Sequence, residues 1–255
     1  MPSYMGKHAE YYDIFYADKP YAEEAQFVDD CLQRFASGPN QSLLELACGT
    51  GKHALEMAQR GYQVLALDYS KDLLEVARRR AAESGANIDF RLADMRELDL
   101  EVEPFDAAIC LFDSIGYVRT NEALKATLDG IHRHIRPGGV FVFEFWHAAA
   151  MLREYESRRE RVWQTGEGEL RRISTTELDV KRQLATVIYD IYDSAIQGEA
   201  GHLQETQINR YFLVQEMDYF LSSSGFESLA FFAGYSLNEA ISEKTWHVLT
   251  AARRK

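Results

Sequence analysis

The fold is decided by the segment Leu43-Leu44-Glu45-Leu46-Ala47-Cys48-Gly49-Thr50-Gly51-Lys52. Its apolar run predicts a strand, its two glycines predict a loop, and Lys52 begins a stretch of helical spacing. Such a loop lets the backbone approach a ligand at the carboxyl edge of a parallel sheet. The spacing Gly49-x-Gly51-x-x-Ala54 also fits the relaxed dinucleotide fingerprint, with Asp68 placed for a ribose contact. The loop alone therefore leaves more than one nucleotide-containing cofactor open.

Outward from this loop, short apolar runs alternate with longer stretches of helical spacing, which is typical of βαβ units. The strands are apolar on both faces, as expected for a parallel sheet with helices on each side. We predict strands at 42–47, 63–67, 88–92, 106–112 and 139–145, and helices at 22–35, 52–60, 71–84 and 121–135. The fold class is α/β, with a doubly wound, Rossmann-like sheet.

The pattern changes after about Ala150, where runs rich in Thr, Val, Ile and Tyr are separated by turn residues. We predict an inserted antiparallel β lid with strands at 161–164, 169–179, 183–193 and 203–214. A helix at 215–224 and strands at 227–232 and 245–252 return to the main sheet. The expected units are a cofactor-covering segment (1–38), the core (39–150 and 215–255) and the substrate lid (151–214).

Charge and composition exclude several classes of protein. The 255 residues include 28 Lys+Arg and 40 Asp+Glu, and the formal net charge of −12 argues against a nucleic-acid partner. No apolar stretch is long enough to span a bilayer, so we expect a cytoplasmic protein without a membrane partner. Three cysteines without a Cys-x-x-Cys motif indicate reduced thiols. No metal site is expected from the spacing of ligand-type residues.

Acidic residues at the ends of the second and third expected strands indicate which of the possible cofactors the glycine loop binds. With the glycine loop, Asp68 and the pair Asp94-Met95, the chain resembles the class I S-adenosylmethionine-dependent methyltransferases. In that family the loop passes beside the amino-acid moiety, the first acid takes the ribose hydroxyls and the second takes the adenine amino group. The resemblance also implies an antiparallel last strand, which the helix and two strands at the end of the chain fit. The resemblance implies S-adenosylmethionine as cofactor, bound by Ala47, Gly49, Gly51, Asp68, Tyr69, Asp94, Met95 and Leu111. Glu45 could order the loop or meet the cofactor's amino group.

A narrower resemblance covers most of the chain. It rests on Tyr4, Tyr12-Asp13, Ser114-Ile115-Gly116, Glu144-x-Trp146 and the antiparallel insertion. These features are similar to those of bacterial N-methyltransferases that dimethylate amino groups on nucleotide-linked deoxysugars; glycine N-methyltransferase is a more distant relative. The resemblance implies methyl transfer to a small-molecule amine, with Tyr4 and Trp146 on the substrate side. Three alternatives are left open: methyl transfer to an oxygen acceptor, a nucleotide-dependent oxidoreductase, and a binding module without enzymatic activity. The protein could form a homodimer.

Two residues are candidates for acid–base work on the acceptor. Tyr117 follows the fourth strand, where the sugar enzymes usually place a histidine, and it could contact the acceptor or form a wall of its site. His147 follows the fifth strand and could serve as a base or be a solvated residue at a helix start. His247 has no recognisable partner pattern.

Aromatic and basic residues outside the core offer further contacts. Tyr12, Tyr16 and Tyr21 could cover the cofactor's methionine end, where ring faces suit a sulfonium, or could pack a helix. A group of arginines could hold a nucleotide diphosphate, although an ion-paired surface is the simpler expectation. This group consists of Arg158, Arg159, Arg161, Arg171 and Arg172.

Overall fold

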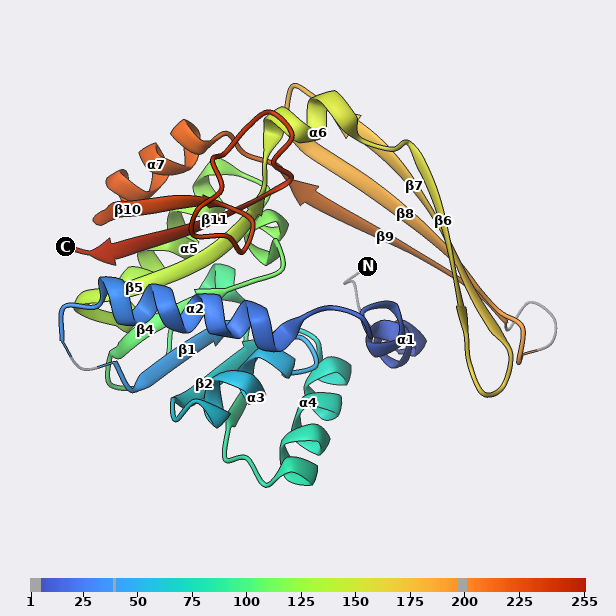
Figure 1. The fold of residues 1–255 in the computed structure, drawn as a ribbon, viewed down its shortest axis with the longest axis horizontal. Coiled ribbons are helices and arrows are strands. Elements are labelled where there is room, and N and C mark those ends of the chain that lie inside the picture. Colours follow the sequence, from blue (N-terminus) through green and yellow to red (C-terminus); the bar gives the residue numbers. More distant parts are fainter. Residues whose placement is uncertain (1–5, 39, 197–200) are drawn as a thin grey trace.

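The computed structural model describes residues 6–38, 40–196 and 201–255. At its centre lies a seven-stranded sheet with the strand order β10-β11-β5-β4-β1-β2-β3 (Figure 1). The parallel strands are β1 (Ser42–Leu46), β2 (Gln63–Asp68), β3 (Asp89–Leu92), β4 (Phe105–Cys110) and β5 (Ile135–Trp146). β11 (His247–Arg254) runs antiparallel to both β5 and β10 (Phe226–Ala233). The expected doubly wound sheet with an antiparallel last strand is confirmed.

The chain order fixes where a ligand can bind. From β1 the sheet grows through β2 to β3 on one side, and from β4 through β5 on the other. The connections therefore leave β1 and β4 in opposite directions, although these two strands are paired, with Glu45 opposite Ile109. In open α/β sheets the crevice at such a switch point, beyond the carboxyl ends of the strands, is the usual ligand site.

Helices cover both faces of this sheet. On one face α2 (Tyr21–Phe35), α3 (Lys52–Gln59) and α4 (Lys71–Ser84) pack with inward-facing residues of β1, β4 and β5. On the other face α5 (Asn121–His134) and α7 (Val214–Ser223) pack with the alternate residues of the same strands. The inner strands β1 and β4 are buried on both faces and are mostly apolar, as the sequence indicated, whereas the edge strands β3 and β10 are partly exposed.

Capping residues set the ends of the longer helices. The Ser70 hydroxyl accepts a hydrogen bond from the Leu73 amide at the start of α4, and Thr120 does the same for Ala123 at the start of α5. Gly85 ends α4 in the left-handed conformation, with φ of 70°.

The lid is a separate four-stranded antiparallel sheet made of β6 (Arg158–Gln164), β7 (Glu169–Asp179), β8 (Leu184–Asp193) and β9 (His202–Arg210). It curves away from the core beside α6 (Ala148–Glu154), and α1 (Lys7–Phe15) lies between it and the core sheet (Figure 1). Phe15 of α1 is buried against Leu170 and Ile191 of the lid. The N-terminal helix is thus part of the lid's packing.

Some predicted boundaries were wrong. β5 begins at Ile135, ahead of the expected turn at Pro137, because Ile135 already pairs with Phe105 and a register shift absorbs the turn. The fourth lid strand ends at Arg210 instead of residue 214, because α7 begins at Val214. α6 was not expected.

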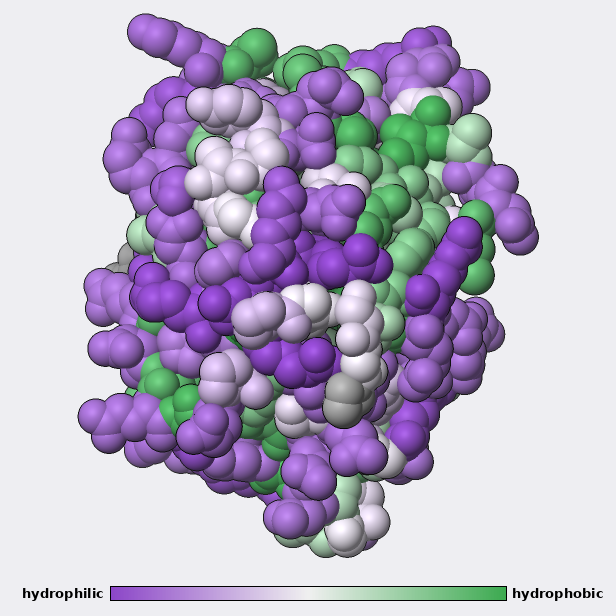
Figure 2. Space-filling model, turned by 90° about the vertical axis from the view of Figure 1, so that its left-hand side faces the viewer, coloured by the Kyte–Doolittle hydropathy of each residue, from purple (hydrophilic) through white to green (hydrophobic). Residues whose placement is uncertain are grey.

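The face of the molecule away from the lid is mostly hydrophilic and carries smaller hydrophobic areas (Figure 2). In the described parts of the chain, no helix is long and apolar enough to cross a membrane. Cys31, Cys48 and Cys110 are free and buried.

Candidate active site

A cavity of about 1290 Å³ lies between the carboxyl edge of the core sheet, α1 and the lid. Residues predicted to bind cofactor or substrate from separate strands and helices meet in its wall. These are Tyr12, Tyr16, Ala47, Gly49, Asp68, Tyr69, Asp94, Met95, Tyr117 and Trp146. The cavity exceeds the usual range for small-molecule sites, and it has room for a cofactor and an acceptor together.

The two loop glycines have different roles. Gly49 has φ of 57° and lines the cavity, and a Cβ there would lie 3.7 Å from the Tyr12 hydroxyl. Gly51 is not among the lining residues; with φ of 73°, a Cβ would approach Ala77 to 2.9 Å. Gly51 is therefore required by the turn and by helix packing, whereas Gly49 is the glycine placed to contact a cofactor directly.

Asp68 holds the loop in place from the end of β2. Its carboxylate accepts hydrogen bonds from the amides of Gly49 and Ser70, each at 2.8 Å. Burial raises the pKa of Asp68 to about 6 despite these hydrogen bonds. At the end of β3, an ion pair with Arg96 holds the pKa of Asp94 below its usual value. Two carboxylates thus border the cavity at the positions expected for ribose and adenine.

A smaller pocket adjoins the glycine loop and is lined by Glu45 together with Tyr12, Tyr21, Ala47 and Leu111. Burial raises the pKa of Glu45 to about 8, and its Oε2 has no hydrogen-bond partner among the described residues. A buried carboxyl without a partner is costly unless a donor or cation joins it. A bound ammonium group would satisfy this carboxyl.

The aromatic N-terminal segment covers the loop, as its composition suggested. Asp13 of α1 accepts a hydrogen bond from the Thr50 hydroxyl at 3.0 Å, lies 3.2 Å from Lys52 and pairs with Arg80. The Tyr12 and Tyr16 rings are in contact, with centroids 4.8 Å apart. These contacts fasten α1 over the glycine loop and close one side of the cavity.

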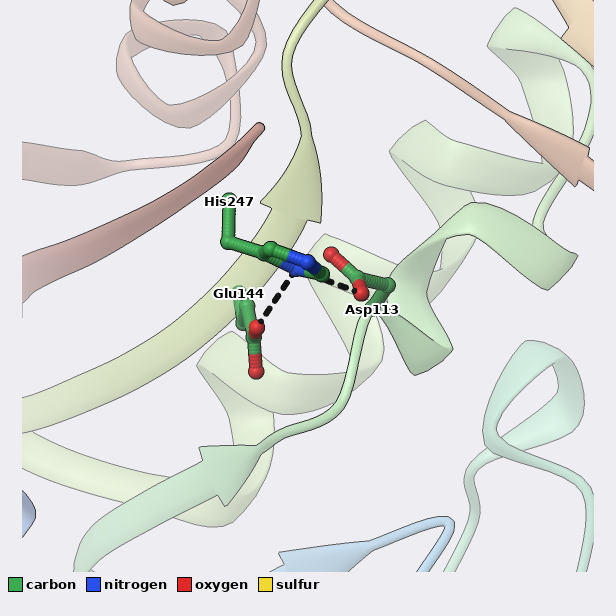
Figure 3. A group of neighbouring side chains, drawn as sticks. All are labelled: Asp113, Glu144 and His247. Carbon is green, nitrogen blue, oxygen red and sulfur yellow. Dashed lines mark ion pairs between the residues drawn. The ribbon is translucent and has the colours of Figure 1, made fainter. Parts of the chain in front are cut away.

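At the other end of the cavity, three residues from different strand ends converge (Figure 3). Nδ1 of His247 lies 2.9 Å from Oδ2 of Asp113 and 2.9 Å from Oε1 of Glu144. Glu144 also accepts hydrogen bonds from the Phe112 amide at 2.7 Å and the Tyr235 hydroxyl at 2.8 Å. We call Asp113, Glu144 and His247 the acid–imidazole group.

The pKa shifts of Asp113, Glu144 and His247 indicate the charge that each of them carries at neutral pH. The Asp113 carboxylate raises the pKa of His247 to about 11, so the imidazole is protonated at neutral pH. Burial raises the pKa of Asp113 to about 6, whereas the ion pair with His247 keeps the pKa of Glu144 below its usual value against the effect of burial. With both acids ionised the group carries one net negative charge. It therefore favours a cation in the cavity.

The expectation that His247 lacks a partner was wrong, because it pairs with Asp113 and Glu144. The donor atoms of the acid–imidazole group also lie within 4.8 Å of one another, which is close enough to share a metal ion. A proton on Nδ1 of His247 competes with a metal for the same site. The usable signal was that Asp113 and Glu144, like Asp68 and Asp94, stand at the carboxyl ends of strands.

The two catalytic candidates from the sequence are placed differently. Tyr117 lines the cavity and donates a hydrogen bond from its hydroxyl to Oε1 of Gln207 at 3.2 Å. His147 is buried, and its Nδ1 lies 3.1 Å from the Thr245 carbonyl oxygen; it is not among the lining residues. The imidazole that lines the cavity is that of His247. Tyr4, expected on the substrate side, lies outside the described residues.

Comparison with known proteins agrees with this geometry. The profile of a family described as "Methyltransferase domain" matches residues 43–139, which include the glycine loop, Asp68, Asp94 and Asp113. These residues form a methyltransferase domain. The resemblance to the class I S-adenosylmethionine-dependent methyltransferases is confirmed for this domain.

Relatives of the methyltransferase domain include sugar N-methyltransferases. The chain is 37% identical over 145 residues to dTDP-3-amino-3,4,6-trideoxy-alpha-D-glucopyranose N,N-dimethyltransferase of Streptomyces venezuelae, an alignment covering 56% of this chain and 59% of that protein. A solved S-adenosylmethionine-dependent methyltransferase from Clostridium acetobutylicum has a TM-score of 0.80 at 19% identity, with 96% of each chain covered. The amino pentose methyltransferase CalS10 of Micromonospora echinaspora, solved with S-adenosylmethionine, has a TM-score of 0.73 at 25% identity and covers 96% of this chain and 98% of its own.

Proposed function

We propose that this protein methylates an amino group of a small molecule, with S-adenosylmethionine as methyl donor. The observation that carries the proposal is a group of net negative charge, formed by the buried Asp113 and Glu144 and the partly exposed His247. This group lines the same cavity as the carboxylate of Asp68. An amine acceptor is cationic in water and would be drawn to such a group. The similarity to dTDP-aminosugar N,N-dimethyltransferases supports an amine on a nucleotide-linked sugar.

The residues fit the cofactor on three counts. The Gly49 cradle admits a ligand close to the backbone, Asp68 can accept from ribose hydroxyls, and the buried Glu45 lacks a partner that an amino group would supply. When bound, S-adenosylmethionine supplies a methyl group on a sulfonium, and the acceptor nitrogen takes it while sulfur keeps the electron pair of the broken bond.

The protein's own contribution is to position the acceptor, exclude water and take up a proton. The amine attacks only as the free base, so its ammonium form must first lose a proton. Asp113 is the acceptor for that proton, because a pKa of about 6 leaves it ionised at neutral pH and still able to bind a proton. The imidazolium of His247 keeps Glu144 ionised beside it. Tyr117 and Trp146 form the neighbouring wall.

The test compares matched acceptors. The purified chain is incubated with S-adenosylmethionine and either a dTDP-linked amino sugar or the same sugar nucleotide with a hydroxyl in place of the amine. Release of S-adenosylhomocysteine and a product heavier by a methyl group are expected only with the amine. Methylation of the hydroxyl compound alone would contradict the proposal, as would failure of S-adenosylhomocysteine to bind.

A further inference from the structure

A buried arginine of the lid lacks an anionic partner. Arg172 on β7 is only 8% exposed and lines the cavity. In the part of the chain that the structure describes, no carboxylate oxygen lies within 4.0 Å of its guanidinium, and its Nε has no hydrogen-bond partner. Removing a charge from water costs several kcal/mol unless it is paired. An unpaired buried guanidinium therefore points to an anion that completes the site.

Aromatic rings hold this guanidinium in place. Its central carbon lies 4.6 to 5.8 Å from the ring centroids of Phe15, Tyr16, Trp163 and Tyr189. Ring faces partly offset the charge and restrict the side chain, but they do not satisfy its N–H donors. A fixed guanidinium with free donors suits recognition of a carboxylate or phosphate.

The strand register adds a second positive charge to the same face. Arg161 of β6 pairs directly with Arg172, so both side chains leave the same side of the lid sheet, and both line the cavity. Like charges directly opposite each other on neighbouring strands are destabilising. No carboxylate among the described residues lies within 4.0 Å of Arg161, whereas neighbouring Arg159 pairs with Glu156 at 2.8 Å. A bound anion would relieve the repulsion between the two arginines.

We propose that Arg172 and Arg161 form an oxyanion subsite for a phosphate or carboxylate group of the acceptor. This inference rests on the proposed function, because it assigns the acceptor's far end to the lid. Tyr16 links the two ends: it contacts Arg172 on one side and Phe112, the residue before Asp113, on the other, with ring centroids 4.8 Å apart. The acceptor would span the cavity with its amine at the acid–imidazole group and its oxyanion at the lid.

The test measures anion binding without methyl transfer. Inorganic pyrophosphate and acetate are titrated into the full chain by isothermal calorimetry at constant ionic strength, with S-adenosylhomocysteine present. We expect saturable binding, weakened roughly tenfold or more in Arg172→Met, because the guanidinium would supply charge-assisted hydrogen bonds to the anion. Arg171→Met is the matched control: Arg171 is the neighbour in sequence, stacks on Tyr192 and leaves the opposite face of the strand. It should bind the anion like the unmodified protein.

Each result of the titrations either supports or contradicts the oxyanion subsite. Tighter binding of pyrophosphate assigns the subsite to a phosphate-bearing acceptor, and tighter binding of acetate assigns it to a carboxylate. Equal affinity in Arg172→Met and Arg171→Met overturns the subsite, as does the absence of saturable binding to the unmodified chain. If Arg172→Met fails to bind S-adenosylhomocysteine, Arg161→Met replaces it, because that side chain is exposed and should not affect folding. Anion binding with no amine methylated would contradict the proposed function alone.

Discussion

Replacing Glu45 with glutamine should stabilise the protein at alkaline pH. The pKa of Glu45 is about 8 in the folded chain and 4.5 in the unfolded one, so the folded state keeps a proton that the unfolded state has lost. The unfolded state therefore binds fewer protons, and the free energy of unfolding falls as pH rises from about 4.5 to about 8, then levels off. At about 1.36 kcal/mol per pH unit, the loss between about pH 5 and pH 8 is at most roughly 3.5 kcal/mol. Glutamine does not ionise and should not show this loss.

The measurement is urea denaturation at a series of pH values without cofactor, comparing the unmodified chain with Glu45→Gln. Asp68 and Asp113 are present in both proteins, and the Asp68 charge contributes to the raised pKa of Glu45, so the difference between the two curves reports Glu45 together with its interaction with Asp68. Glu75→Gln is the control, because that carboxyl is 61% exposed and its removal should leave the pH dependence unchanged. Parallel curves for the unmodified chain and Glu45→Gln would refute a neutral buried carboxyl at this position.

Three further substitutions test the site. Asp68→Ala should weaken S-adenosylhomocysteine binding by about 1–3 kcal/mol through lost charge-assisted hydrogen bonds, and unchanged affinity in calorimetry would remove Asp68 from the ribose position. Asp113→Asn should lower kcat by roughly 10²–10⁴ while S-adenosylhomocysteine affinity stays the same, and an unaltered kcat would exclude Asp113 as proton acceptor. Tyr117→Phe should lower kcat up to about tenfold with cofactor affinity unchanged, which corresponds to one hydrogen bond, and normal turnover would argue against an acceptor contact.

The sequence predicts the core of the fold because local and global signals agree there. The apolar strands, the glycine loop and the cap of α4 at Ser70 each specify the same βαβ arrangement. Boundaries were less accurate where tertiary pairing overrides local chemistry. Pro137 and the glycines after it indicate a turn, yet β5 already pairs with β4 at Ile135. Such pairing depends on a residue 30 positions earlier and cannot be read from the turn itself.

The residues proposed to bind the cofactor could be predicted from the sequence because they follow strands that are consecutive in the chain. Asp68 and Asp94 end successive parallel strands, so their convergence follows from topology. The acid–imidazole group differs, because His247 begins an antiparallel strand more than 100 residues after Glu144. Its place beside Glu144 depends on β11 inserting between β5 and β10, an arrangement that no local spacing encodes.

Two regions of the cavity wall carry opposite charge, which constrains how an acceptor can bind. Asp113 and Glu144 outweigh His247 in one region, whereas Arg161 and Arg172 of the lid have no carboxylate oxygen within 4.0 Å among the described residues. An acceptor with an amine and an oxyanion would be favoured in one orientation, since the reverse would place its ammonium against two guanidinium groups and its anion against two carboxylates. A simple amine without the anion would lack this discrimination and would be held at one end only. In the proposed binding mode, orientation by both charges would place the acceptor nitrogen next to Asp113, and such positioning can supply much of the rate acceleration of an in-line displacement.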